Sequence, residues 1–166
     1  MLTPLLARLP WLVICIFLGL PVQATETTKQ IVGAVEQITI VEAGIDFEAR
    51  IDTGAASCSI DASDIRIIKS TSAGAVQRIS FMVSNRSGEQ RHLSADVDSV
   101  TRIRNAEGAS IRYKVPLTVH WHGQEKTVLF TLKSRKNMTY HILLGRNWLH
   151  DDYIVDVDRK PSKSVR

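Results

Sequence analysis

The sequence predicts an all-β fold, a barrel or sandwich of short strands within one domain. Runs rich in Ile, Val and Thr recur along the 166 residues, with turn signals about every dozen residues. No stretch has a helical period long enough to compete, apart from one short turn at 145–149. The chain length is that of a single domain.

The individual strands follow from alternation of apolar and polar residues. Residues 31–41 and 45–51 read as strands joined by a turn at 42–44, whereas 61–68 is open between a strand and one helical turn. A final strand is expected at 153–157. The remaining strands are expected as three hairpins, with the strand pairs 79–83 and 93–97, 100–104 and 110–113, and 115–121 and 126–132.

The amino terminus has the pattern of a secretory signal peptide over residues 1–24. Arg8 is its only charge, an apolar run extends from Trp11 to Leu20, and Val22-Gln23-Ala24 places small residues at a cleavage site. The alternative is an uncleaved anchor. We expect cleavage, with no stable membrane anchor afterwards, a periplasmic or secreted domain over 25–158, and a disordered basic tail over 159–166.

Charge and cysteine content exclude some classes of protein. The net charge of +4 is mild, and no basic run is interleaved with aromatic residues, so we expect no nucleic-acid binding. Beyond the leader only Cys58 remains, so no internal disulfide can form. Its neighbours in the sequence favour a buried structural thiol over a reactive one.

The candidate chemistry begins with the tripeptide Asp52-Thr53-Gly54, which follows the strand at 45–51. Asp52 has the parity of the polar residues in that strand, which suits a carboxylate that faces a cleft. The Thr53 hydroxyl can hydrogen-bond across a tight turn, and Gly54 allows close backbone approach. Taken alone, the tripeptide is also an ordinary turn sequence.

A second motif ends the segment 132–146, where Leu144-Gly145-Arg146 precedes the predicted helical turn. With the first motif it resembles the retropepsin-like aspartic endopeptidases of bacteria, a family with the older label ATP-dependent zinc protease. The resemblance covers residues 31–158. It implies a closed barrel of the acid-protease type, a single lobe with one short helix, a hairpin flap at 79–97, a peptide or protein substrate and no cofactor. It assigns catalysis to Asp52, Thr53 and Gly54.

Peptide hydrolysis by carboxylates needs two of them, one ionised and one protonated. This chain has a single Asp-Thr-Gly, so a two-fold homodimer is expected to bring two copies of Asp52 together. Arg50 and Ala55 flank the motif. The Arg50 guanidinium would favour the ionised pair if it approaches it, and otherwise it is a solvated charge. For Arg146 we consider Asp61 and Asp64 as partners, because Ala56 and Ser57 occupy the region in which retroviral enzymes carry an aspartate.

A metal site is the alternative that the older family label suggests. The chain has five histidines, of which His120 and His122 would share one face of a strand, but no His-Glu-x-x-His and no phosphate-binding glycine loop. No third ligand stands at a diagnostic spacing, so we expect no metal. The second functional class is a non-catalytic module that holds a peptide or cell-envelope ligand on the same barrel, and a zinc protease ranks below it.

Overall fold

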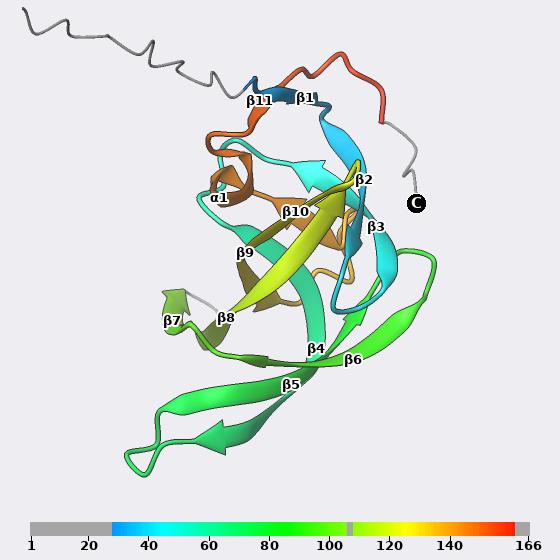
Figure 1. The fold of residues 1–166 in the computed structure, drawn as a ribbon. Coiled ribbons are helices and arrows are strands. Elements are labelled where there is room, and N and C mark those ends of the chain that lie inside the picture. Colours follow the sequence, from blue (N-terminus) through cyan, green and yellow to red (C-terminus); the bar gives the residue numbers. More distant parts are fainter. Residues whose placement is uncertain (1–27, 106–107, 162–166) are drawn as a thin grey trace, which may run out of the picture.

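The structure is a computed structural model that describes residues 28–105 and 108–161 (Figure 1). The predicted signal peptide at 1–24 and residues 162–166 of the predicted tail lie outside the described residues. The first residue of that tail is ordered, because Arg159 donates hydrogen bonds to the carbonyls of Ile31 and Asp156.

Six strands close into a barrel, so the predicted all-β fold is confirmed. Each strand pairs with the next, and the last pairs again with the first. In order around the barrel they are β10 (Ile142–Leu144), β3 (Ile45–Ile51), β2 (Val35–Ile40), β8 (Gly108–Trp121), β9 (Gln124–Lys133) and β4 (Cys58–Ser70).

The other elements extend the barrel at its two ends (Figure 1). The far half of β4 continues below it with the strands β5 and β6, and β7 pairs with β8. At the top, β1 and β11 form a separate two-stranded sheet near the short helix α1. The bounds of these elements are β5 (Val76–Ser84), β6 (Gln90–Asp96), β7 (Ser99–Asn105), β1 (Gln30–Val32), β11 (Tyr153–Val155) and α1 (Arg146–Leu149).

The barrel interior is filled by alternate residues of its strands, as the sequence pattern of β3 predicted. In β3 the apolar residues Ile45, Phe47 and Ile51 are buried, and the polar residues between them face outward. Aromatic packing joins the barrel to its upper end, because Trp121 of β8 packs edge-on against both Trp148 and Tyr153. The rings of Trp148 and Tyr153 stack with centroids 4.1 Å apart. The Asp52-Thr53-Gly54 motif therefore leaves β3 from a strand fixed by the core.

Two strand boundaries differ from the prediction, and the structure settles the one segment that the sequence left open. The strand expected at 31–41 is split after β1, because the buried carboxylate of Glu36 accepts hydrogen bonds from Gly33 N at 2.6 Å and Trp121 Nε1 at 3.2 Å. The ambiguous segment 61–68 belongs to β4. Its alternation is interrupted by a bulge around Asp64, whose φ is +49°. The predicted break within 110–121 is absent, since β8 runs through it.

The hairpin that was expected to act as a flap is present as β5 and β6, but its tip is attached to the barrel. Asn85 at this tip is buried and donates from Nδ2 to Asp46 O at 3.0 Å and to Glu89 Oε2 at 2.8 Å. Beyond Asn85, residues 86–90 of this tip are all exposed, as are residues 72–75 at the tip of the β4–β5 hairpin, and each tip has a glycine with positive φ, Gly88 at +87° and Gly74 at +82°. The role of the β5–β6 hairpin as a flap stays a prediction.

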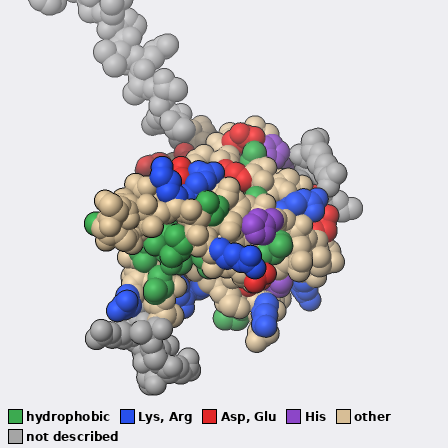
Figure 2. Space-filling view, turned by 90° about the horizontal axis from the view of Figure 1, so that it is seen from below, with side chains coloured by type: hydrophobic (Ala, Val, Ile, Leu, Met, Phe, Trp, Pro, Cys, Tyr) green, Lys and Arg blue, Asp and Glu red, His purple; other side chains and the backbone are tan. Residues whose placement is uncertain are grey.

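The face of the molecule seen from below has hydrophobic and charged side chains on different parts. Hydrophobic side chains gather on one side of it, and charged and histidine side chains are spread over the rest (Figure 2). Large exposed apolar residues of the lower strands are Ile67 and Ile68 of β4, Val100 of β7 and Ile111 of β8.

Candidate active site

Asp52 lies where β3 leaves the barrel, next to the end of β10. Its backbone N–H donates to Leu144 O at 2.9 Å, which continues the parallel pairing of β3 with β10 by one residue. Leu144 is fully buried, so this contact fixes the start of the Asp52-Thr53-Gly54 turn to the core. The Asp52 side chain is half-buried.

The turn itself orients the Asp52 carboxylate. Oδ1 accepts hydrogen bonds from Gly54 N at 2.9 Å and from Ala55 N at 3.2 Å. A Cβ added at Gly54 would lie 3.1 Å from that same oxygen, so the glycine is needed for close approach. Oδ2 has no hydrogen-bond partner among the described residues. One oxygen is thus held by the backbone while the other is available.

Arg146 supports the turn from behind, and its expected partners were wrong. Its Nη1 donates to the carbonyls of Thr53 at 3.0 Å and Gly54 at 2.9 Å, and not to Asp61 or Asp64. Asp61 accepts instead from Ser84 Oγ at 3.1 Å and from the backbone N–H of Arg135. Asp64 is exposed in the bulge of β4. The guanidinium replaces an ion pair with two charge-assisted hydrogen bonds to backbone carbonyls.

Gly145 allows the second motif to pack directly against the first. A Cβ at this position would lie 2.8 Å from the carbonyl oxygens of Ala55 and Ser57. The next backbone N–H, that of Arg146, donates to Ala55 O at 2.8 Å. Both motifs therefore form one unit in which no side chain fits between the backbones.

Cys58 belongs to this same unit as a structural thiol. It is fully buried, and its backbone N–H and its thiol both lie within hydrogen-bond distance of Asn147 Oδ1, at 2.9 and 3.1 Å. Gly145 N donates to its sulfur at 3.4 Å. Burial raises the pKa of the Cys58 thiol to about 12. A thiol with this pKa remains protonated and unreactive at neutral pH.

The outer face of the barrel beside Asp52 carries several cations. Directly paired residues run from Arg50 on β3 through Leu143, Ser59 and Thr131 to Lys114 on β8. Residues paired directly across strands point to the same face. Arg50 itself is exposed and has no hydrogen bond or ion pair with any described residue. Its contribution to an aspartate pair stays a prediction.

Lys133 brings a further charge close to Asp52. It follows Thr131 by two residues in β9 and so lies on the same face. Burial lowers its pKa, the charges of Arg135 and Arg112 lower it further, and the carboxylate of Asp52 opposes the shift. These effects indicate that Asp52 faces a region of positive potential.

Sequence reasoning assigned no role to Arg135, although it lies within the second motif segment. The side chain is only 7% exposed, and it donates from Nε to Tyr140 O at 3.0 Å and from Nη1 to Ser59 Oγ at 3.2 Å. Burial lowers its pKa, while Asp61 and Asp52 oppose the shift. Its spacing from Gly145 in the sequence was the available signal, but nothing in the sequence identified Ser59 as its neighbour.

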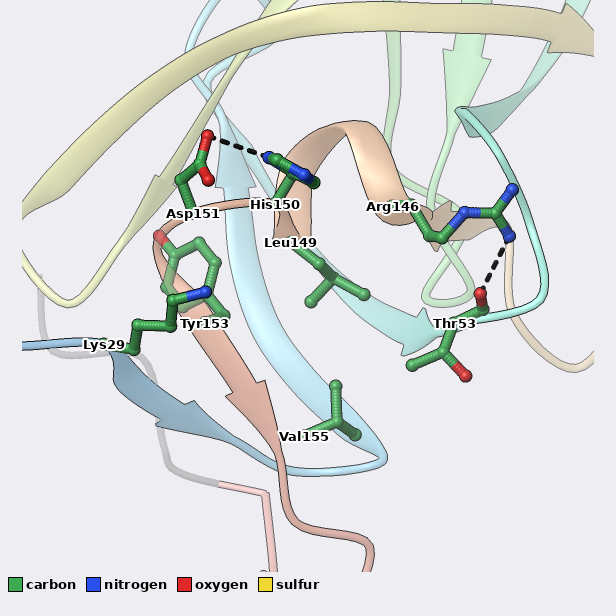
Figure 3. A pocket seen from close by; sticks show the side chains of 8 residues that line it. All are labelled: Lys29, Thr53, Arg146, Leu149, His150, Asp151, Tyr153 and Val155. Atoms are coloured by element: carbon green, nitrogen blue, oxygen red, sulfur yellow. Dashed lines mark hydrogen bonds and ion pairs between the residues drawn. The ribbon is translucent and has the colours of Figure 1, made fainter.

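A pocket of about 400 Å³ opens on the other side of the Asp52-Thr53-Gly54 turn (Figure 3). Leu149 and Val155 point into it, and Thr53 and Arg146 lie across it from Tyr153. Thr53 is exposed, and its hydroxyl has no hydrogen-bond partner among the described residues. The full lining is Lys29, Thr53, Arg146, Leu149, His150, Asp151, Tyr153 and Val155.

The histidines that could have begun a metal site do not share a strand face, contrary to the prediction. His120 is in β8, but His122 lies beyond its end in the turn, with a φ of +48°. Within residues 28–105 and 108–161, no three His, Cys, Asp or Glu side chains are grouped so as to hold a metal ion. In the same residues no helix is long and apolar enough to cross a membrane.

Comparison with known families decides the classification. Residues 31–165 match the family model described as RimB-like, retropepsin-like aspartic endopeptidase RimB. The chain belongs to this RimB-like family. The match spans both motifs and the whole barrel, so the resemblance predicted from Asp52-Thr53-Gly54 and Leu144-Gly145-Arg146 is confirmed.

A solved structure supports the fold of this RimB-like chain. This chain is similar to the crystal structure of Lpg0085, a protein of unknown function (DUF785) from Legionella pneumophila subsp. pneumophila str. Philadelphia 1. The TM-score is 0.68 at 24% sequence identity, over 81% of this chain and 98% of that chain. No curated protein matches. At this identity the likeness establishes the fold alone.

Proposed function

We propose that this protein is an aspartic endopeptidase that hydrolyses peptide bonds with a pair of Asp52 carboxylates, one from each chain of a homodimer. The observation that carries this proposal is the state of the Asp52 side chain. Gly54 N and Ala55 N hold Oδ1, and Oδ2 has no partner among the described residues. The carboxylate is therefore oriented by its own turn and retains one oxygen for chemistry.

The reaction follows from two carboxylates that share one proton. The ionised carboxylate takes a proton from water as the water oxygen attacks the scissile carbonyl carbon. The protonated carboxylate donates its proton to the carbonyl oxygen, which gives a tetrahedral diol. Collapse of the diol breaks the C–N bond, the amine leaves with a proton, and the pair returns to its starting charge. One water and one peptide bond are consumed, and the pair of carboxylates is regenerated.

A homodimer supplies the second carboxylate because the chain has only one Asp-Thr-Gly. Mixing wild type with Asp52→Asn under conditions that exchange subunits tests this directly. Equal amounts give about a quarter wild-type, a half mixed and a quarter mutant dimers. If one Asp52 from each chain is required, activity per wild-type subunit falls to about half. Unchanged activity per wild-type subunit would rule out the shared pair.

The same barrel could instead hold a peptide without cleaving it. Asp52→Asn separates the two functions, because it keeps the shape of the turn but removes the charge that water activation needs. An endopeptidase variant of this kind binds its peptide and no longer cleaves it. If the wild type also binds without cleavage at every pH between about 3 and 8, the range in which aspartate pairs change protonation, the binding module is the better description.

The cations beside Asp52 favour an acidic peptide as substrate. Arg50 and Lys133 lie on the face of the barrel to which Asp52 belongs, and Arg112 acts on Lys133. A peptide series in which Glu replaces Gln on either side of the scissile bond should therefore give a higher kcat/KM, and salt should reduce the difference. Lys133→Gln should reduce it as well. Equal cleavage of the Glu and Gln peptides would refute this preference.

The cellular location and the absence of metal remain part of the proposal. Residues 1–24 support export to the periplasm or the medium. Mass spectrometry of the exported protein should find a chain that begins near Thr25, and a membrane-bound product that keeps Met1 would contradict this. Chelator should leave activity unchanged. Loss of activity that zinc restores would instead favour metal-dependent hydrolysis.

A further inference from the structure

The β4–β5 hairpin extends beyond the barrel and beyond its neighbouring strands. β4 pairs with β9 only as far as Asp61, and from Ala62 onward its pairing is with β5. β6 in turn pairs with β5 only as far as Arg78. The end of the hairpin, residues 66–77, therefore projects from the lower end of the molecule (Figure 1).

This projecting end exposes two consecutive isoleucines. The register between β4 and β5 shifts between Ile67 and Lys69, which leaves Ile68 without an opposed residue in β5. Ile67 and Ile68 are each 55% exposed. The residues that follow, 70–77, carry no charge. Aliphatic residues that are exposed together, rather than singly, mark a contact surface.

The β7–β8 hairpin adds two more exposed aliphatic residues at the same end. The segment that joins β6 to β7 contacts the first hairpin, because Val97 N donates to Gln77 O at 2.8 Å. Val100 and Ile111 are 48% and 51% exposed. They share one face of their hairpin, since Val100 is paired directly with Tyr113, two residues after Ile111. Figure 2 shows hydrophobic side chains gathered on one side of this end.

The same end of the molecule has an excess of cations. Five of its lysine and arginine side chains have no ion pair with any described residue, namely Arg66, Lys69, Arg102, Arg112 and Lys114. Two carboxylates there, those of Asp64 and Asp98, likewise have no ion pair with a described residue, and Asp96 pairs with Arg78 at 2.8 Å. The unpaired cations outnumber the unpaired carboxylates, so this end attracts an anionic surface.

We propose that these two hairpins dock the protein on an anionic lipid bilayer. Ile67, Ile68 and the exposed aliphatic residues of the β7–β8 hairpin enter the boundary between headgroups and acyl chains, and the unpaired cations bind lipid phosphates. An anionic bilayer satisfies both features at once, because apolar side chains gain by leaving water and Lys and Arg are attracted by the surface charge. Docking requires neither cleavage nor a pair of Asp52 carboxylates, so this inference goes beyond the proposed function.

An acidic protein is the other partner that the charge alone would allow. Protein–protein interfaces are enriched in aromatic residues, which often carry much of the binding energy. None of the large hydrophobic side chains exposed among the described residues is aromatic. Long cationic side chains can lay their stems on the acyl boundary while their charges reach the phosphates. Exposed aliphatic residues mixed with such cations therefore favour lipid.

Sedimentation with vesicles tests the docking. The exported protein should sediment with vesicles of equal parts phosphatidylglycerol and phosphatidylcholine, and remain in solution with vesicles of phosphatidylcholine alone. Raising the salt concentration should weaken the binding severalfold, because the surface charges are screened. Asp52→Asn should bind as the wild type does, so docking is measured separately from cleavage. Absence of binding to the mixed vesicles would overturn the inference.

A matched pair of variants locates the surface. Ile68→Asp removes an aliphatic contact and adds a negative charge at the docking end, and it should reduce binding to the mixed vesicles by about tenfold or more. Val157→Asp adds the same charge two residues beyond β11, at the upper end of the molecule, where Val157 is 73% exposed. It should leave binding within about twofold of the wild type, because a charge far from the bilayer is screened. Thermal unfolding checks that both variants are folded.

The outcomes separate docking through these hairpins from its alternatives. Loss of vesicle binding in Ile68→Asp, with Val157→Asp unchanged, is the expected result. Equal losses in both variants would mean adsorption driven by net charge alone, and the inference would be wrong. If the wild type instead binds soluble poly-glutamate but not the mixed vesicles, and Ile68→Asp abolishes that binding, the surface serves an acidic protein and the inference is likewise wrong.

Discussion

Replacing Gly145 by alanine should separate the catalytic turn from the motif that supports it. The added Cβ would lie 2.8 Å from the carbonyl oxygens of Ala55 and Ser57. These are backbone atoms, so no side chain can rotate away to make room. Either the turn or the start of α1 must move by several tenths of an ångström. That movement would lengthen the hydrogen bond of 2.8 Å from Arg146 N to Ala55 O.

The expected cost follows from this collision. Overpacking of a well-packed site costs about 1 to 3 kcal/mol. For a domain of this size, about 1 kcal/mol corresponds to roughly 3 °C in Tm. Gly145→Ala should therefore lower Tm by about 3 to 9 °C. The effect on activity should be larger than this loss of stability implies, because Ala55 N also binds Asp52 Oδ1 at 3.2 Å.

The control replaces a glycine far from the turn, at a position where alanine should reduce the stability by a comparable amount. Gly44 lies at the opposite end of β3, has a φ of +63°, and a Cβ there would meet no atom within 4 Å. Gly44→Ala should cost about 1 to 2 kcal/mol through its backbone angle alone. Thermal unfolding and kcat/KM are measured for both variants. If Gly145→Ala, when folded, keeps as much activity as Gly44→Ala, the coupling between the two motifs is refuted.

Three more predictions follow from the same site. Arg146→Lys should weaken the two hydrogen bonds that Nη1 donates to the Thr53 and Gly54 carbonyls, because a flexible ammonium does not present its N–H groups in the fixed directions of the planar guanidinium. We expect stability to fall by about 1 to 2 kcal/mol, measured by urea unfolding, and kcat to change more than KM in steady-state kinetics. Burial raises the pKa of Cys58 to about 12 from 9.0, so the unfolded thiol ionises first and stability is lost as pH rises from about 9 to 12. The free energy of unfolding, measured with urea, should therefore be about 2 kcal/mol lower at pH 10.5 than at pH 8 because of this thiol. Cys58→Ala should not show this part of the decrease. Arg50→Leu should shift the alkaline limb of the pH–rate profile upward by a few tenths of a unit, because an exposed cation favours the ionised pair only weakly.

The barrel was predictable where one residue type dominates one face of a strand. In β3 the alternation from Ile45 to Ile51 predicted its bounds, and the structure confirms them. The same rule failed for β4, because the bulge at Asp64 shifts the parity within the strand. It failed again for His122, because a residue with positive φ lies in a turn that alternation alone does not reveal.

The candidate site was predictable as a motif and not as a set of contacts. Asp52-Thr53-Gly54 identifies the turn, since each residue type has a local task there. The partners of Arg146 depend on where β10 crosses the barrel, and β10 pairs with both β3 and β4. Sequence distance, on which Asp61 and Asp64 were considered, carries no information about that crossing. The pairing of β11 with β1 could not be predicted for the same reason, because the two strands are more than a hundred residues apart in the sequence.

Asp61 is bound by other residues, which explains why Arg146 has no carboxylate partner among the described residues. Asp61 is buried, so its charge must be satisfied, and it accepts from Ser84 Oγ and from the backbone N–H of Arg135. It therefore ties the segment after β9 to the β5 hairpin and is no longer available to the catalytic turn. The guanidinium of Arg146 is exposed, so the cost of leaving it without a counter-ion is small. It can then hold two carbonyls of the turn, which an ion pair with Asp61 would prevent. The two motifs are thus joined by backbone contacts, and both Asp52 Oδ2 and the Thr53 hydroxyl have no hydrogen-bond partner among the described residues.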